Sequence, residues 1–158
     1  MSVETTIERP ETVERTAHTP FAPATCYTPK IINSDNCEAM RLMDSESVDL
    51  VVTSPPYGNL RQYGGHGWDF YGVAWNLTRL LKPGGVIVWI VNDATEDGSE
   101  TGTSMEQCLH FKRLGLRLHD TMIYRKTNKP PLNHPRYEQE WEYAFVLSKA
   151  YSHSCGKA

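Results

Sequence analysis

Four consecutive residues, Ser54, Pro55, Pro56 and Tyr57, form a turn whose chemistry suits the binding of an amino group. Two adjacent prolines fix two φ angles and remove two backbone donors, so the turn presents rigid carbonyl oxygens. Such a carbonyl beside the Ser54 hydroxyl could accept both N–H protons of an exocyclic amine, leaving its lone pair aimed outward. Tyr57 offers a flat face on which a planar ring can stack. The alternative is a strand-ending turn followed by a core aromatic.

Strands and helices alternate around this turn. The apolar runs "VDLVV" (48–52) and "VIVWIV" (86–91) are typical of strands that are covered on both faces of a parallel sheet. A helix with one apolar face is expected between them and is ended by the Pro-Gly-Gly turn at 83–85. Further elements are expected as a helix over 105–114 and strands at 116–126 and 141–148. This alternation predicts an α/β fold with a largely parallel sheet.

Three polar features are expected at the carboxyl ends of strands. Asp35 follows a short predicted strand, Ile31-Ile32, the Ser-Pro-Pro-Tyr turn follows 48–52, and Asn92-Asp93 follow 86–91. In open α/β sheets, ligands bind just beyond the carboxyl ends of the strands. The sequence therefore predicts a ligand site at this edge of the sheet.

The segment "DLVVTSPPYG" closely resembles the catalytic motif of the DNA amino-methyltransferases, which methylate N4 of cytosine or N6 of adenine. "IINSDNCEAM" resembles the segment in which an acidic residue meets the adenine of S-adenosylmethionine. "LTRLLKPGGVIVWIVND" and "EWEYAFVLSK" resemble later segments of the permuted subclass, which places its catalytic half first. The resemblance covers residues 31–149 and implies a partial Rossmann-like methyltransferase sheet that depends on S-adenosylmethionine and lacks the cofactor-loop strands.

The resemblance assigns the catalytic residues as Ser54, Pro55, Pro56 and Tyr57. Ser54 and the Pro55 carbonyl would hold the target amine, and Tyr57 would stack on the flipped base, which must leave the duplex because its amine is otherwise paired. No covalent enzyme intermediate is needed, so the cysteines are not expected to be nucleophiles. Serine at position 54, rather than Asp or Asn, favours N4 of cytosine over N6 of adenine.

The resemblance also implies cofactor and DNA contacts. Asp35, together with Thr53, is expected to bind S-adenosylmethionine, although a turn-capping role is the alternative for Asp35. Phosphate contacts are expected from a basic cluster in the segment "RKTNKPPLNHPRY", although such a cluster can also be solvated surface and three glutamates lie close by. The expected DNA-binding residues are Arg125, Lys126, Lys129 and Arg136.

The domain organisation predicted from composition and resemblance has three parts. Residues 1–24 are rich in Thr, Glu, Pro and Arg and are expected to form a disordered arm. Residues 25–149 form the catalytic half of a methyltransferase domain, and residues 150–158 form a disordered tail. The Gly-rich loop that carries the methionine end of the cofactor has no counterpart. We therefore expect a half-sheet with exposed apolar edge surface, which a second polypeptide or a second copy would complete.

Composition sets the broad class of protein. The chain has 158 residues, a net charge of −3 and 39% hydrophobic residues, which is typical of a soluble globular domain. The four cysteines show no metal-ligand spacing, so no metal is expected. No apolar run approaches the roughly eighteen residues of a membrane span, and the N-terminus lacks a signal-peptide core. These features predict a cytoplasmic protein without a membrane partner.

Two other functions use the same residues. A catalytically silent remnant of a methyltransferase could bind DNA or a partner through the same surface. An RNA or protein-glutamine methyltransferase could use a similar Pro-Pro-Tyr turn to hold a planar amine or amide.

Overall fold

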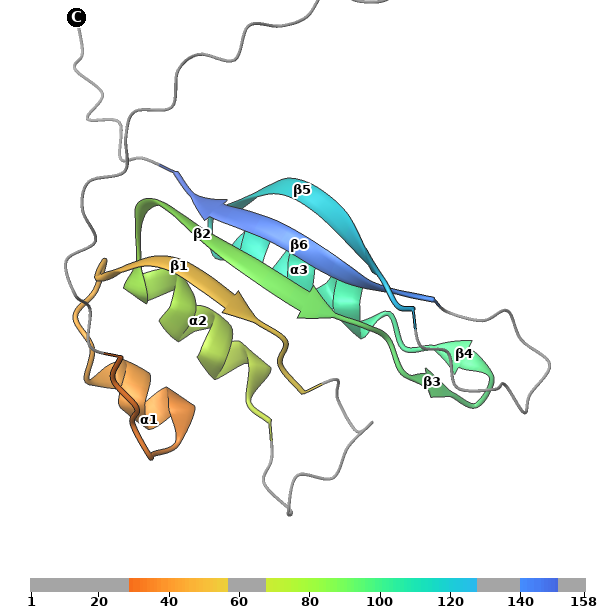
Figure 1. Cartoon of the computed structure of the whole chain (residues 1–158), viewed down its shortest axis with the longest axis horizontal. Coiled ribbons are helices and arrows are strands. Elements are labelled where there is room, and N and C mark those ends of the chain that lie inside the picture. The colour runs from red at the N-terminus through yellow and green to blue at the C-terminus, as the bar shows by residue number, and fades with distance from the viewer. Residues whose placement is uncertain (1–28, 57–67, 128–139, 151–158) are drawn as a thin grey trace, which may run out of the picture. The chain divides into compact units, whose positions relative to one another are not determined.

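A computed structural model describes residues 29–56, 68–127 and 140–150. The chain divides into two units, 1–31 and 32–158, and every helix and strand described below belongs to the second. In chain order these elements are α1 (Asn36–Arg41), β1 (Val48–Thr53), α2 (Phe70–Leu80), β2 (Leu81–Val91), β3 (Thr95–Glu96), β4 (Ser99–Glu100), α3 (Thr103–Arg113), β5 (Leu116–Arg125) and β6 (Trp141–Lys149) (Figure 1).

The main sheet is mixed and has the strand order β1-β2-β6-β5, whereas β3 and β4 form a separate small hairpin. β1 and β2 are parallel and are joined by α2, which makes a βαβ unit. β6 is antiparallel to both β2 and β5. The expectation of a largely parallel sheet is therefore wrong. No described helix lies between β5 and β6, and neighbouring strands joined without a crossover helix pair in opposite directions.

Both α2 and α3 pack against one face of the sheet (Figure 1). Alternate residues of β2, Ile87, Trp89 and Val91, are buried in a core that also contains side chains of the two helices. The indole N–H of Trp89 donates to Gln107 Oε1 on α3 at 2.8 Å, so the one polar atom of this buried ring is satisfied. The aromatic core thereby fixes α3 relative to β2.

β1 lies at an edge of the sheet and is covered on one face only. Leu50 and Val52 are 58% and 61% exposed, so the prediction of a strand buried on both faces is wrong for β1. The expectation of exposed apolar surface at this edge is confirmed. The helices that the described residues contribute all lie on the other face, which leaves these two side chains uncovered.

The segment before β1 differs from its prediction. Neither Ile31 nor Ile32 belongs to a strand, and Asp35 begins the short helix α1 instead of ending a strand. Ile-Ile is too short a run to predict a strand without a pairing partner, whereas Asp before "NCEAM" is a strong N-cap signal. The predicted strand at Ile31-Ile32 is therefore absent, and the first regular element of the described residues is helix α1.

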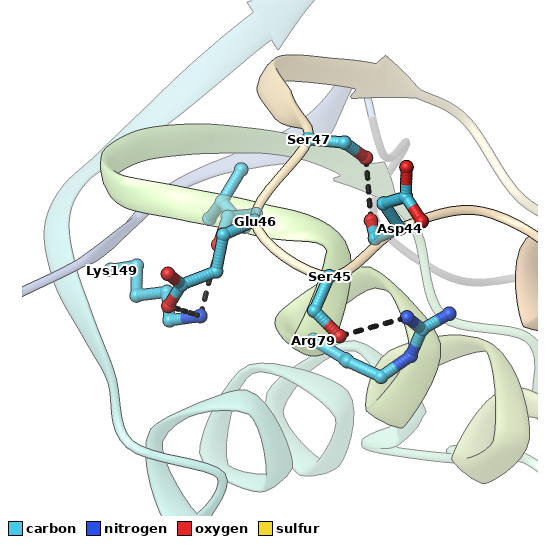
Figure 2. Close-up of polar contacts among 7 residues, drawn as sticks. Asp44, Ser45, Glu46, Ser47, Arg79 and Lys149 are labelled. Carbon is cyan, nitrogen blue, oxygen red and sulfur yellow. Dashed lines mark hydrogen bonds and ion pairs between the residues drawn. The ribbon is translucent and has the colours of Figure 1, made fainter.

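Two cationic side chains hold the connection between α1 and β1 (Figure 2). Arg79, near the end of α2, donates to the Met40 carbonyl at 2.6 Å and to Ser45 Oγ at 3.0 Å. Lys149, at the end of β6, lies 3.1 Å from Glu46 Oε1 and donates to a backbone carbonyl of β2 at 2.9 Å. These contacts fix where β1 starts, and because the strand is continuous, they also help to place the turn at its other end.

Candidate active site

The carboxyl ends of β1 and β2 meet at one edge of the sheet. The two strands are parallel (Figure 1). Thr53, the last residue of β1, is paired in register with Trp89. Ser54-Pro55-Pro56 follow β1 at this edge, and Asn92-Asp93 follow β2. Two of the three polar features that the sequence predicted at a shared edge are thus brought together by the strand pairing.

The proline turn is anchored in the protein while its serine faces outward. Pro55 is buried, Pro56 is half-buried and Ser54 is exposed. Because proline has a fixed φ, a buried Pro55 holds the adjoining carbonyl groups in a defined position. The arrangement suits a rigid pair of acceptors that a ligand can reach. Tyr57, the fourth residue of the predicted motif, lies outside the described residues.

Asp93 connects this edge to helix α3. Its Oδ1 accepts hydrogen bonds from the Ser104 backbone N–H at 2.9 Å and from Thr101 Oγ1 at 3.3 Å. Its Oδ2 accepts a short hydrogen bond from the Ser104 hydroxyl. The N-cap residue of α3 is Gly102, which has no side chain to cap the helix, so Asp93 supplies the missing acceptor. The carboxylate thus orders the loop that follows β2.

Asp35 approaches the same edge by a different route from the one predicted. Its Oδ1 accepts from the N–H groups of Cys37 at 2.9 Å and Glu38 at 3.0 Å, as a helix N-cap does. Asp69 caps α2 in the same way, through a 2.9 Å bond from the Gly72 N–H. Burial raises the pKa of the Cys37 thiol, and the charges of Asp35 and then Asp69 raise it further. α1 packs on α2, and Cys37 lies in the same buried cluster as Phe70, the first residue of α2, so the starts of the two helices are close neighbours.

The path of α2 relates these two helix starts to the strand ends. α2 begins after the loop that leaves the carboxyl end of β1 and finishes at Leu80, directly before β2 begins. Its first turn therefore lies toward the carboxyl ends of β1 and β2, and Asp35 lies near that first turn. Thr53, the other predicted cofactor residue, is half-buried at the end of β1.

The described part of the predicted basic cluster lies at the carboxyl end of β5. β5 runs in the same direction as β2 because each is antiparallel to β6. Arg125 and Lys126 therefore stand at the same edge of the sheet, two strands away from β2. Lys126 Nζ is 2.6 Å from a Glu142 carboxylate oxygen, and Arg125 is 3.9 Å from Glu140. Lys129 and Arg136 lie outside the described residues.

Two further findings concern the described residues as a whole. Among the described residues, no group of three or more His, Cys, Asp and Glu side chains is arranged to hold a metal ion. No helix in the same part of the chain is long and apolar enough to cross a membrane.

Known proteins identify the family. The family model for N6 and N4 methyltransferases, described as DNA methylase, matches residues 48–155, which is more than half of the chain. The chain belongs to this DNA methylase family.

Two curated relatives match part of the chain. The orphan methyltransferase M.BamHII of Bacillus amyloliquefaciens is 52% identical over 103 residues, which cover 65% of this chain and 39% of that protein. The Type II methyltransferase M.SmaI of Serratia marcescens is 36% identical over 84 residues, which cover 46% of this chain and 29% of that protein. The chain thus spans less than half the length of either relative.

Solved structures share the fold. TTHA0409 from Thermus thermophilus, described as a "Putative DNA Modification Methylase" and solved in complex with S-adenosyl-L-methionine, matches with a TM-score of 0.59 and 27% identity, over 78% of this chain and 56% of its own. The PvuII DNA methyltransferase (cytosine-N4-specific) matches with a TM-score of 0.60 and 20% identity, over 74% of this chain and 48% of its own. At 20% identity the likeness concerns the fold alone. The two solved structures together confirm the predicted α/β class, a partial Rossmann-like methyltransferase sheet.

Some contacts near the site can be predicted from neighbouring residues in the sequence, and others cannot. Asp69, directly before a helical run, carries a local N-cap signal that sequence reasoning did not use. The Asp93–Ser104 and Trp89–Gln107 contacts join residues 11 and 18 positions apart on different elements. No short-range pattern announces such pairs, and only the packing of α3 on the sheet brings them together.

Proposed function

We propose that the chain is the catalytic part of a DNA amino-methyltransferase, which transfers a methyl group from S-adenosylmethionine to the exocyclic amine of a flipped base. The observation that carries the proposal is the Ser54-Pro55-Pro56 turn, with Pro55 buried and Ser54 exposed, at the carboxyl end of a strand in a member of the DNA methylase family. N4 of cytosine is the preferred target over N6 of adenine, because serine occupies position 54.

In this proposal the turn binds and orients the amine. Ser54 Oγ and the Pro55 carbonyl oxygen accept its two N–H protons and direct the nitrogen lone pair away from the turn. S-adenosylmethionine, when bound, supplies an electrophilic methyl group on a positively charged sulfur. The amine nitrogen would then form its bond to the methyl carbon as the C–S electron pair leaves with sulfur, and the amine would lose one proton to solvent. Positioning carries most of the catalysis, since no covalent enzyme intermediate is needed.

The other predicted site residues take supporting roles. Asp35 and Thr53 are proposed to contact S-adenosylmethionine, which fits the carboxylate and hydroxyl that they bring toward the carboxyl ends of β1 and β2. Tyr57 is proposed to stack on the flipped base. Arg125 and Lys126, with Lys129 and Arg136, are proposed to contact phosphates, for which Lys126 must exchange Glu142 for DNA.

The chain matches only part of the length of its relatives, and this affects whether it can act without another polypeptide. The chain covers 39% of M.BamHII and 56% of TTHA0409. We propose that residues outside this sequence complete the cofactor site, and a second polypeptide or a second copy of the chain could supply them. The rest of the M.BamHII sequence, outside the matched region, is a concrete choice for that polypeptide, and we call it the complementing segment.

The experiment is transfer of a labelled methyl group from S-adenosylmethionine to DNA, RNA or protein, with and without the complementing segment. Methylation of DNA at cytosine N4, when the segment is present, is the expected result. Methylation of RNA or protein in place of DNA would support an RNA or protein methyltransferase. If no acceptor is methylated under either condition, the chain is a silent remnant and the proposal is wrong.

A further inference from the structure

Two buried polar contacts join the carboxyl end of β2 to the first two turns of α3. The Trp89 indole N–H donates to Gln107 Oε1 at 2.8 Å, and Asp93 accepts from the backbone N–H and the hydroxyl of Ser104. Ser104 and Gln107 are three positions apart on α3, so they lie on the same side of the helix. We call the four residues Trp89, Asp93, Ser104 and Gln107 the strand clamp.

The strand clamp concentrates polar groups at one place in the interior. Among the described residues, the buried polar side chains are Asn76, Asp93, Ser104, Gln107 and Ser148. Three of these five belong to the strand clamp, and Trp89, its fourth member, is fully buried. The polar groups of the interior therefore gather where β2 reaches the edge of the sheet that carries the candidate site.

Buried hydrogen bonds fix a position more sharply than apolar packing does. Burial of apolar area has no direction, whereas a hydrogen bond weakens steeply with distance and angle, and a buried group that loses its partner is costly. Apolar side chains of similar volume often stabilise a fold equally well or better than a buried polar pair. The strand clamp therefore points to placement of the strand end relative to α3 and not to stability alone.

Strand pairing passes the position of β2 on to β1. Thr53 pairs in register with Trp89, in a ladder whose register shift lies near the start of β1. Ser54 follows Thr53 directly, and the buried Pro55 with its fixed φ comes next. The path from Gln107 to Ser54 thus consists of one buried hydrogen bond, one strand pairing and one peptide bond.

We infer that Asp93, Ser104 and Gln107 are positioning residues for methyl transfer. The strand clamp sets where β2 ends, and through the pairing of Thr53 with Trp89 it places the turn that carries Ser54. The catalytic part of this inference rests on the proposed function. Placement matters because a displacement of about 1 Å at a reacting group can cost about 10²-fold in rate.

Ser104→Ala tests the strand clamp with a small change, because the bond from the backbone N–H to Asp93 stays in place. Ser148→Ala is the matched control: Ser148 is also a buried serine, but it pairs with Val86 at the end of the β2–β6 ladder farthest from the turn. Methyl transfer by the full chain with the complementing segment is measured per folded chain. Ser104→Ala is expected to lower kcat about tenfold or more and to change the KM for DNA less than about twofold. Ser148→Ala is expected to match the unaltered chain.

Gln107 allows a loss and a rescue at one position. Gln107→Met keeps a similar volume but offers only a weak acceptor to the Trp89 indole, so kcat should fall as in Ser104→Ala. Gln107→Glu keeps an acceptor oxygen and should recover most of the lost turnover. If the strand clamp only stabilised the fold, the rate per folded chain would be the same in all these variants.

Amide NMR spectra of the full chain test the placement of the turn without any activity. Ser104→Ala and Gln107→Met are expected to shift the amide resonances of Thr53 and Ser54, whereas Ser148→Ala should leave them in place. If the unaltered chain methylates no acceptor, the proposed function is wrong, and these resonances alone then decide whether the strand clamp places the turn.

Three results would overturn the inference. The first is an unaltered rate per folded chain in Ser104→Ala and Gln107→Met. The second is a loss of rate in Ser148→Ala as large as that in Ser104→Ala. The third is unmoved amide resonances of Thr53 and Ser54 in the two strand-clamp variants.

Discussion

Asp93, just after β2, accepts hydrogen bonds from both the backbone N–H and the hydroxyl of Ser104 in the first turn of α3. Asp93 is 9% exposed and Ser104 is 1% exposed. One carboxylate therefore ties the edge of the sheet that carries the candidate site to the helix packed beneath it. The contact explains why a loop of polar residues has a defined course next to the proline turn.

We expect Asp93→Asn to lower the free energy of unfolding by about 1–3 kcal/mol, because a neutral amide offers one acceptor where two oxygens are used. Urea denaturation measures the change. Asp49→Asn is the control, since Asp49 forms an exposed ion pair with Lys82, and such pairs contribute about 0–1 kcal/mol. Equal losses for the two variants would mean that Asp93 does not hold α3.

Ser54→Ala removes one of the two proposed acceptors for the target amine. We expect methyl transfer by the complex with the complementing segment to fall about 10²–10³-fold, the usual cost of losing one positioned hydrogen-bonding group. Binding of S-adenosylmethionine should change little. Initial rates with labelled cofactor measure the effect, and Ser99→Ala, in an exposed hairpin, provides the control. A Ser54→Ala variant with full activity would contradict the proposed role.

Arg79→Met should release α1 from α2, because the guanidinium donates to the Met40 carbonyl and to Ser45 Oγ. We expect faster hydrogen exchange at Cys37 and Glu38 and a loss of about 1–3 kcal/mol in unfolding free energy. The control is Arg113→Met, at the exposed end of α3. Unchanged exchange in α1 would show that its helix does not depend on Arg79.

The buried thiols should make stability fall at high pH. Burial raises the pKa of Cys108, partly offset by the charge of Lys112, and burial raises that of Cys37. The folded chain therefore holds these protons more tightly than the unfolded chain, whose thiols titrate near 9.0. The contribution is complete below that pH and is lost as pH rises through the folded pKa values.

Two measurements check the thiol prediction. The free energy of unfolding should decline more steeply above pH 9 in the unaltered chain than in Cys37→Ala/Cys108→Ala. In a Cys26→Ser/Cys155→Ser background, a thiol reagent at pH 8 should react slowly until urea unfolds the chain. Rapid labelling of the folded chain would contradict the burial of Cys37 and Cys108.

Glu142 is expected to restrain the proposed phosphate contact of Lys126, since the two side chains lie 2.6 Å apart. Glu142→Gln should tighten DNA binding about two- to threefold, whereas Lys126→Gln should weaken it and reduce the salt dependence by about one phosphate contact. Fluorescence anisotropy across a salt series measures both. Lys112→Gln on α3 serves as the control, and an identical effect there would mean that net charge alone acts.

Local patterns in the sequence predicted the elements around the site. The apolar run ending in two prolines predicted β1 and its end, because proline removes the donors that a strand needs. A helix with one apolar face was expected between the two apolar runs, and α2 is that helix, with Val73 and Leu77 buried. The run "VIVWIV" predicted the core of β2. The exposed apolar edge of β1 was also expected from the sequence, because the resemblance implied a sheet without the cofactor-loop strands.

The sequence by itself determined where the main strands and helices lie and that a rigid proline turn follows β1, since these depend on neighbouring residues. Only the tertiary structure decided that β6 inserts antiparallel between β2 and β5 and that Asp93 meets Ser104. Strand partners, uncovered faces and contacts between distant elements depend on how the whole chain packs. A local pattern records which side chains prefer burial, but not which surface is available to bury them.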